Sequence, residues 1–149
     1  MRFAPCLLLG CIVIASCTKR GQLPLPRLNT WVVDEKTFYK QSAHWDTSNS
    51  MNTIYFNDDS LNGLGLTFTH KPTNSKMYKI VYQPQSDDEV SIEEWRNNNG
   101  RSGSQDGVNK YLTVTKTDNG LNFATVSIPL RHYTWVVDYN VSCAFNLSE

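Results

Sequence analysis

The chain has four cysteines, at positions 6, 11, 17 and 143. A thiol acts as a nucleophile or a metal ligand only where its surroundings lower its pKa. Cys143 lies between Val141 and Phe145, in a segment that alternates apolar and polar residues, so we expect it to be buried as a small hydrophobic residue. No Cys-x-x-Cys or Cys/His zinc spacing is present. We therefore expect no catalytic cysteine, no metal site and no cofactor.

Acidic residues gather in Asp87-Asp88-Glu89 and in Glu93-Glu94. Paired carboxylates can perform acid–base chemistry or bind calcium. Neither group has the alternating ligands and glycine of an EF-hand loop, and we interpret both as solvated edges. A Gly-x-Ser-x-Gly elbow and a phosphate-binding loop are absent from the sequence as well. These observations predict that the chain is not an enzyme.

Cys17 ends an apolar N-terminal stretch that follows a single positive charge, Arg2. The stretch is too short to cross a bilayer, which needs ~20 apolar residues. It ends in "IASC", residues 14–17, which resembles the lipobox of bacterial lipoproteins. In that family the signal peptide is cut before the cysteine, whose sulfur receives a diacylglycerol and whose new α-amine is acylated. The resemblance implies a signal peptide over residues 1–16, cleavage between Ser16 and Cys17, and lipid attachment at Cys17.

An ordinary signal peptide, or an uncleaved anchor with a chance cysteine, is the alternative interpretation. Under the lipobox interpretation, residues 17–28 form a tether with two prolines between the membrane and a domain of residues 29–149. The lipid on Cys17 makes the membrane a partner, and we expect an outer-membrane or cell-surface location. Loss of Arg2 leaves one more acid than base, so no basic field attracts nucleic acid. Cys143 then remains without a cysteine partner for an intramolecular disulfide.

The elements that position these residues are predicted to be strands throughout the domain. Val, Ile, Thr, Tyr and Trp are frequent, and polar turn clusters recur along the chain. "TDNG", residues 117–120, predicts a tight hairpin turn because Asn and Gly tolerate positive φ. Residues 97–107 contain no apolar side chain, so we expect a long mobile loop there. The expected strands cover residues 30–34, 37–45, 51–57, 63–69, 76–83, 90–95, 109–116, 121–129 and 135–147.

The last of these strands exceeds the usual 3–10 residues, so we expect a bend near residues 138–140 or two strands. "TWVVD" occurs at residues 30–34 and again at 134–138, which we interpret as coincidence between two strand-forming segments. If the repeat has a meaning, the first and last strands occupy similar environments, as neighbours in one sheet would.

The opening "WVVDEKTF", the hairpin "YLTVTKTDNGLNFATVSIPL" and the terminal "VSCAFNLS" are similar in layout to a family of small lipoproteins of unknown function from Bacteroides-type bacteria. The resemblance covers most of residues 29–149, with Glu35 where glycine is usual in the family. It implies a single all-β domain, an antiparallel meander folded as a β-sandwich or a lipocalin-like barrel of about 8–10 strands. It implies no activity.

Two surface positions are candidate sites. Asp59-Ser60-Leu61 resembles the Asp-Ser/Thr-aliphatic site at which such bacteria O-glycosylate exported proteins, which makes Ser60 an expected glycosylation site; an ordinary turn is the alternative. Trp95 has the opposite parity to Val90 and Ile92 and adjoins the expected loop, so it is a candidate for an exposed aromatic that contacts a ligand. A core tryptophan beside a solvated loop is the alternative. The other tryptophans are expected in the core, at positions 31, 45 and 135.

Two functions stay open on the sequence alone. The first is a non-catalytic lipoprotein whose β-domain binds a glycan, a small ligand or a protein partner. The second is a lipid-anchored periplasmic enzyme or enzyme inhibitor. A lined cavity or an aromatic platform would favour binding, and clustered polar groups with perturbed pKa values would favour catalysis.

Overall fold

The structure is a computed structural model of the chain, and it describes residues 25–97, 101–107, 109–133 and 138–148. Residues 1–16, which the sequence predicts to be a signal peptide, and Cys17 therefore lie outside the described residues. The described part contains strands, turns and bends but no helix, so it has no helix long and apolar enough to cross a membrane. The all-β class expected from the sequence is confirmed.

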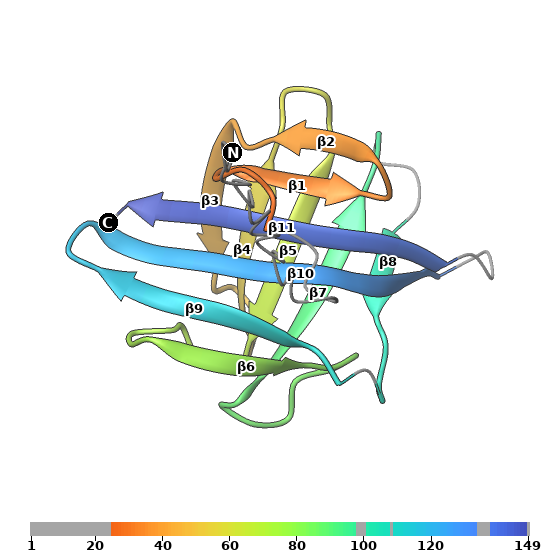
Figure 1. Cartoon of the computed structure of the whole chain (residues 1–149). Coiled ribbons are helices and arrows are strands. Elements are labelled where there is room, and N and C mark those ends of the chain that lie inside the picture. The colour runs from red at the N-terminus through yellow and green to blue at the C-terminus, as the bar shows by residue number, and fades with distance from the viewer. Residues whose placement is uncertain (1–24, 98–100, 108, 134–137, 149) are drawn as a thin grey trace, which may run out of the picture.

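The described residues form eleven strands, one more than the upper end of the about eight to ten expected. Their bounds are β1 Thr30–Val33, β2 Lys36–Tyr39, β3 Ser42–Asp46, β4 Asn52–Asn57, β5 Gly63–Phe68, β6 Lys76–Ile80, β7 Glu89–Trp95, β8 Arg101–Ser104, β9 Tyr111–Thr117, β10 Gly120–His132 and β11 Asp138–Ser148. They belong to one curled sheet in the order β2-β1-β11-β10-β9-β6-β7-β5-β4-β3 (Figure 1). Among the described strand pairs only β6–β7 is parallel, so the sheet is mixed rather than a purely antiparallel meander.

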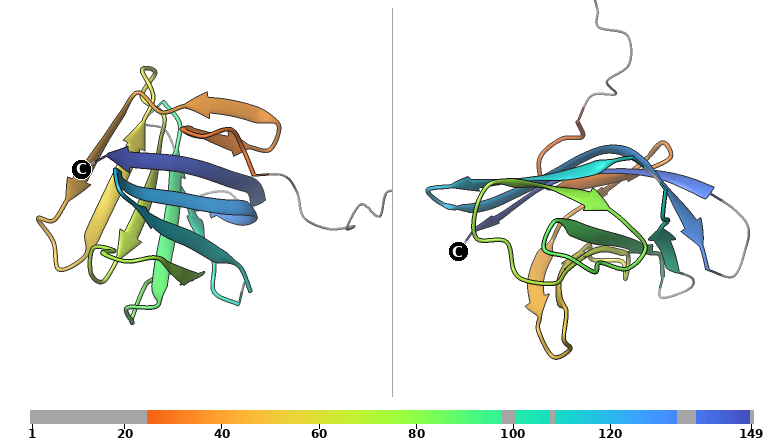
Figure 2. Two further views of the ribbon diagram at one scale, coloured as in Figure 1. Left: turned by 60° about the vertical axis from the view of Figure 1, so that its left-hand side comes forward. Right: turned by 90° about the horizontal axis from the view of Figure 1, so that it is seen from below.

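The sheet is partly closed because β8 pairs with both β7 and β10. Strands β10, β9, β6, β7 and β8 thereby complete a ring, with β5-β4-β3 extending from β7 and β11-β1-β2 extending from β10. Seen from below, the curled sheet forms two layers that face each other (Figure 2, right). We call them the β9–β10–β11–β1 layer and the β4–β5–β7–β8 layer.

The core lies between the two layers and follows the period-two alternation of the strands. Phe56 of β4 stacks on Phe145 of β11, with ring centroids 3.9 Å apart, and Trp31 of β1 stacks on Phe38 of β2 at 5.2 Å. Trp31 is fully buried, as expected, and Trp45 is partly buried against Phe68. Trp135 lies outside the described residues. The alternation predicted by the sequence therefore produces one continuous aromatic-rich core.

The expected strand over residues 37–45 is wrong, because β2 and β3 end up at opposite edges of the sheet. The break falls at Lys40 and Gln41, where the backbone changes hydrogen-bond partners. The Lys40 amide donates to the Asn29 carbonyl at 2.9 Å, whereas the Gln41 amide donates to the Asn57 carbonyl of β4 at 2.8 Å. The inward parity also changes at this corner, from Phe38 in β2 to Ala43 and Trp45 in β3. A single continuous strand over residues 37–45 could not place these side chains in one core.

The expectation of a long mobile loop over residues 97–107 is also wrong, although residues 98–100 lie outside the described chain. Residues 101–104 form β8, and Ser102 and Ser104 are buried. The Ser104 hydroxyl donates to the Val81 carbonyl at 2.5 Å and accepts the Ile92 amide at 3.0 Å. These hydrogen bonds and the ladder pairing compensate for the missing apolar side chains.

The predicted hairpin turn at "TDNG" and the inward parity of the last strand are confirmed. The expected bend near residues 138–140 is not tested, because residues 134–137 lie outside the described chain. Asp118 and Asn119 form the two-residue turn between Thr117 and Gly120, and Gly120 has φ +125°. Val141, Cys143 and Phe145 of β11 all face the core. β11 is one strand from Asp138, beside a register irregularity in β10, and it pairs with β1. The first and last described strands are thus neighbours, while most of the second "TWVVD" lies outside the described residues.

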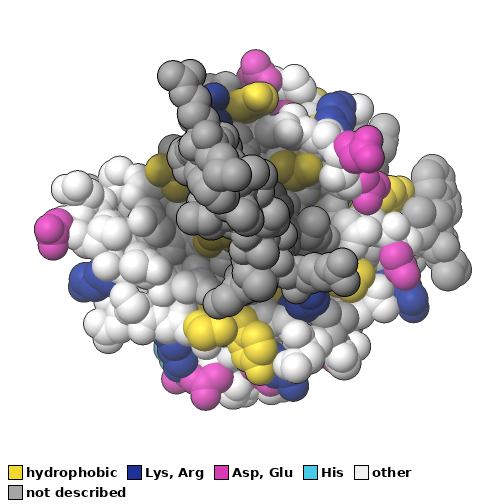
Figure 3. Space-filling model, viewed as in Figure 1, with side chains coloured by type: hydrophobic (Ala, Val, Ile, Leu, Met, Phe, Trp, Pro, Cys, Tyr) yellow, Lys and Arg dark blue, Asp and Glu magenta, His cyan; other side chains and the backbone are white. Residues whose placement is uncertain are grey.

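The outer side of the β9–β10–β11–β1 layer faces the viewer in Figures 1 and 3. Its visible hydrophobic side chains lie in small groups among polar surface (Figure 3). Residues 25–29 precede β1, and Leu28 lies beside Asn122 of β10 and Asn146 of β11. The chain therefore enters the domain on this layer, away from the β4–β5–β7–β8 layer (Figure 2).

Candidate functional site

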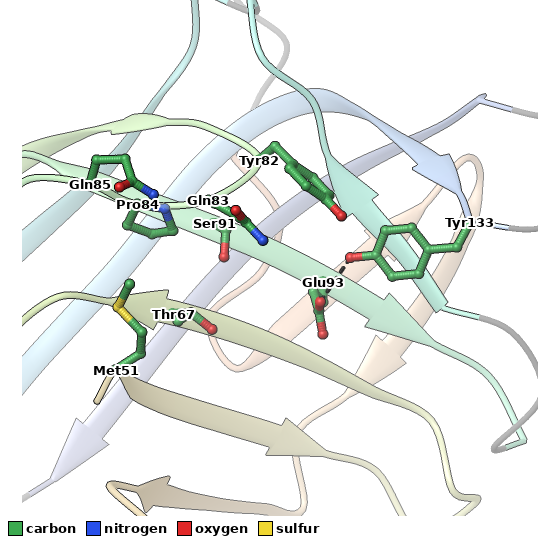
Figure 4. A pocket seen from close by; sticks show the side chains of 9 residues that line it. All are labelled: Met51, Thr67, Tyr82, Gln83, Pro84, Gln85, Ser91, Glu93 and Tyr133. Carbon is green, nitrogen blue, oxygen red and sulfur yellow. Dashed lines mark hydrogen bonds between the residues drawn. The ribbon is translucent and has the colours of Figure 1, made fainter. Parts of the chain in front are cut away.

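A pocket of about 340 Å³ opens on the outer side of the β4–β5–β7–β8 layer (Figure 4). Polar groups line it together with two tyrosines, a proline and a methionine. The lining residues are Met51, Thr67, Tyr82, Gln83, Pro84, Gln85, Ser91, Glu93 and Tyr133. A concave site with apolar surface and a few converging polar groups is the usual form of a small-ligand site. We refer to it as the tyrosine pocket.

Tyr133 lies across the top of β8 and points towards β7 (Figure 4). Its hydroxyl donates to Glu93 Oε1 at 2.8 Å. Gly103 of β8 makes this position accessible, because a Cβ atom there would overlap the Tyr133 ring. Gly103 is paired with Glu93 in the ladder, so the glycine and the carboxylate lie directly beside each other. A half-exposed phenol is thereby held over the sheet by a charge-assisted hydrogen bond.

Tyr82 forms the opposite rim of the pocket. Its ring centroid is 6.5 Å from that of Tyr133, and the two planes meet at 83°. Its amide donates to Asp106 Oδ1 at 3.0 Å. The turn that follows is held by Glu89, whose Oε2 accepts the Gln85 amide at 2.7 Å and the Ser86 amide at 3.2 Å. The rim is therefore fixed at both ends, which lowers the entropic cost of binding a ligand there.

Trp95 lies on the same outer side as Glu93, two residues further along β7. The parity argument from the sequence is confirmed, and the side chain is partly exposed. It lies over the backbone of β5, because a Cβ atom at Gly63 would overlap the indole. Its ring also meets the edge of the Tyr55 ring, with centroids 5.7 Å apart. Trp95 does not line the tyrosine pocket, although it lies on the same outer side of β7 as Glu93.

Glu93 and Glu94 are adjacent in sequence yet point to opposite sides of β7. The interpretation of both as solvated edges is therefore wrong for Glu94, which is buried between the layers. Burial raises the pKa of the Glu94 carboxyl, although Arg96 acts against that rise. Arg96 Nε donates to Glu94 Oε1 at 2.8 Å, and the guanidinium lies 5.1 Å from the Tyr139 ring centroid. The two carboxylates cannot act together on one ligand.

The acids at positions 87–89 each have separate partners. Asp87 Oδ1 accepts from the Thr69 hydroxyl at 2.6 Å and contacts His70 Nδ1 at 2.7 Å, and these hydrogen bonds lower the pKa of its carboxyl. Asp88 pairs with Lys76, and Glu89 holds the turn described above. No group of three or more metal-ligating side chains occurs among the residues that the structure describes.

Ser60 lies in an exposed turn between β4 and β5. Asp58 Oδ1 accepts the amides of Ser60 at 2.8 Å and Asn62 at 3.0 Å, and Leu61 is held at φ +62° with 62% of its surface exposed. The Asp59-Ser60-Leu61 tripeptide is therefore presented on a rigid turn. Cys143 is fully buried, and burial raises the pKa of its thiol to about 12.

Sequence reasoning missed the residues that make the tyrosine pocket. The predicted strand over residues 76–83 includes Tyr82, whereas β6 ends at Ile80, and no sequence pattern points to Tyr133. The only local signal was the pair of glycines at 63 and 65 on one side of β5, with a third at 103, since glycine in a strand often marks the close approach of another group. No protein-family model, no curated protein and no solved structure matches the chain.

Proposed function

We propose that the chain is a lipid-anchored, non-catalytic binding protein of the bacterial outer membrane or cell surface, and that it holds a glycan in the tyrosine pocket. The observation that carries the proposal is the pairing of Tyr82 and Tyr133 over Glu93. A sugar ring has apolar C–H faces and a rim of hydroxyl groups. Tyrosine offers a flat apolar surface with a polar end, and a carboxylate accepts hydrogen bonds from hydroxyl groups.

The other groups in the pocket have the same chemistry. Gln83 extends towards its centre, and the Thr67 and Ser91 side chains face it from β5 and β7 (Figure 4). Amide and hydroxyl side chains both donate and accept hydrogen bonds, so they suit a ligand whose hydroxyl groups do the same. A purely apolar ligand would displace water from the Gln83, Thr67 and Ser91 side chains without replacing its hydrogen bonds, which is costly.

The position of the pocket is consistent with the proposed anchor. Residues 25–29 enter the domain on the β9–β10–β11–β1 layer (Figure 2). The residues that line the pocket include Thr67 of β5 and Glu93 of β7, which belong to the other layer. A lipid on Cys17 would then hold the first layer nearer the membrane and leave the pocket directed away from it. The division of Glu93 and Glu94 between two sides of β7 supports a binding role over one that needs a carboxylate pair.

The test compares two tyrosines of similar exposure on opposite layers. Tyr133 is 50% exposed beside the pocket, and Tyr111 is 43% exposed on the other layer. The full chain, purified in detergent, is applied to an array of oligosaccharides. Tyr133→Ala should weaken the best hit about tenfold to a hundredfold, since losing contact with one aromatic ring costs ~1.5–3 kcal/mol. Tyr111→Ala should leave it unchanged.

Equal losses in the two variants would contradict the assignment of the site, and no hit at all would contradict glycan binding. Release of shortened or modified sugar from the wild-type chain would contradict a non-catalytic role and favour the lipid-anchored enzyme.

We also propose that Ser60 is O-glycosylated. The rigid, exposed turn around it supports access by a transferase. Intact-mass measurement of the native protein should show a glycan mass that disappears in Ser60→Ala. If Ser60→Ala keeps the same added glycan mass, or if the native protein has none, Ser60 is not glycosylated and belongs only to a structural turn.

A further inference from the structure

A second hollow of about 280 Å³ adjoins the tyrosine pocket on the other side of the same two rings. It shares Tyr82 and Tyr133 with the first, and its remaining walls include Gln105, Asp106 and Arg131. Each hollow lies near or below the lower end of the size range of small-ligand sites, ~300–1,000 Å³, whereas the two together fall well within it.

The second hollow has polar groups but no surplus of positive charge. Arg131 Nε donates to Asp138 Oδ1 at 3.2 Å, and Gln105 Nε2 donates to the same oxygen at 3.3 Å. The Arg131 charge is therefore balanced by Asp138. Asp106 adds a carboxylate in this hollow, and Glu93 adds one in the first. An acidic sugar would be repelled by these carboxylates, while a neutral sugar can donate hydroxyl hydrogens to them.

The angle between the two tyrosines bears on the shape of the ligand. Their planes are nearly perpendicular, at 83°. One flat ring cannot lie against both faces at once. Two sugar rings joined by a rotatable glycosidic bond can lie at an angle to each other, so that each contacts a different tyrosine.

We propose that the two hollows are adjoining subsites for a neutral oligosaccharide of at least two sugar units, with the Tyr82–Tyr133 pair at the junction between units. The proposal rests on the glycan-binding function proposed above. The first unit occupies the tyrosine pocket beside Glu93 and Gln83. The next unit occupies the second hollow beside Gln105.

The experiment is calorimetry with the full chain in detergent and with neutral oligosaccharides of one to six units, built from glucose, mannose or xylose. A matched series of uronic-acid oligomers tests the charge argument. Affinity for the best neutral series should rise at least tenfold between one unit and two or three units. The uronic-acid series should bind at least tenfold more weakly at equal length.

Two glutamines serve as matched variants. Gln105→Ala should remove most of the gain with chain length and leave the affinity for one unit within about twofold. Gln83→Ala should weaken one unit and longer chains by the same factor. Thermal melts check that both variants remain folded. Gln105→Glu keeps the size of the side chain but loses the amide that donates to Asp138 and places a second carboxylate beside that residue, so it should also reduce the gain with chain length.

The outcomes separate the two proposals. Binding of a neutral sugar without any gain from chain length overturns the second subsite and leaves the proposed function standing. Preferential binding of the uronic-acid series overturns the neutral ligand class. Failure of every sugar to bind overturns the proposed function together with the subsite.

Discussion

The outer sides of the two layers differ in the side chains that lie over their strands. On the β4–β5–β7–β8 layer, Trp95 and Tyr133 lie flat over glycines at positions 63 and 103. On the β9–β10–β11–β1 layer, a row of short side chains crosses the neighbouring strands, from Thr113 through Ala124 to Ala144. Within the described part of the chain, no aromatic ring is in contact with Tyr111 of that layer.

The difference shows how a β-sheet makes room for a site. A strand that carries a Cβ at each outward position keeps neighbouring rings upright and separate, whereas a glycine lets a ring approach the backbone. Glycines on one layer let the aromatic rings gather into a surface with a pocket between them. The other layer has no comparable gaps at the row described, and it is the layer on which the chain enters the domain.

The largest effect is expected at the proposed anchor, which decides the side that faces the membrane. Cys17→Ala removes the thiol proposed to accept the diacylglycerol, so incorporation of an alkynyl fatty acid should fall to background. Glycan binding by the detergent-purified chain should be unchanged, because the pocket lies on the opposite layer. Undiminished label on the variant would rule out lipidation at Cys17.

The core shared by both layers is tested at Cys143. Cys143→Ser should lower the free energy of unfolding by about 1–3 kcal/mol, because a hydroxyl replaces a thiol in an apolar site. The wild-type thiol, with a pKa of about 12, should react with a maleimide only after denaturation. Denaturant titration and mass spectrometry measure the two effects. Rapid labelling of Cys143 in the native chain would mean that β11 has a different register.

A smaller effect is expected where a ring approaches the sheet. Gly63→Ala places a methyl group where the Trp95 indole lies, so the ring must move outwards. The free energy of unfolding should fall by about 1 kcal/mol, at the low end for overpacking because Trp95 is partly exposed. Tryptophan emission should shift to longer wavelength. Thr113→Ala on the other layer is the control and should change stability by less than about 0.5 kcal/mol; equal effects would remove the distinction between the two layers.

The smallest effect concerns Glu94 on the inner side of β7. Because its pKa in the folded chain lies above the ordinary value of 4.5, the folded chain holds this proton more tightly than the unfolded chain does. The resulting stabilisation is fully present below pH 4.5 and is lost as the pH rises through the folded-state pKa. Wild type should therefore gain stability relative to Glu94→Gln as the pH falls through that window. A difference that does not change with pH, measured by denaturation at several pH values, would contradict the burial of this carboxyl. Glu93→Gln, on the outer side, is the matched control.

The sequence by itself determined the features that depend on near neighbours along the chain. Alternation with a period of two identified the all-β class and placed Cys143 inwards and Trp95 outwards, since successive side chains of a strand point to opposite sides. The turn residues of "TDNG" predicted the β9–β10 hairpin because backbone conformation at positive φ is a local property.

Only the tertiary structure decided which strands pair across long distances and what meets above them. The corner at Lys40 and Gln41 and the strand β8 depend on hydrogen bonds to partners far away in sequence. The sequence of β8 gives almost no local signal of a strand. Its serine and glycine residues form a strand only because β7 and β10 pair with it on both sides. The same pairing brings Tyr133 over Gly103 and next to Tyr82. The pocket thus arises from the closure of the sheet, which no segment of the sequence encodes alone.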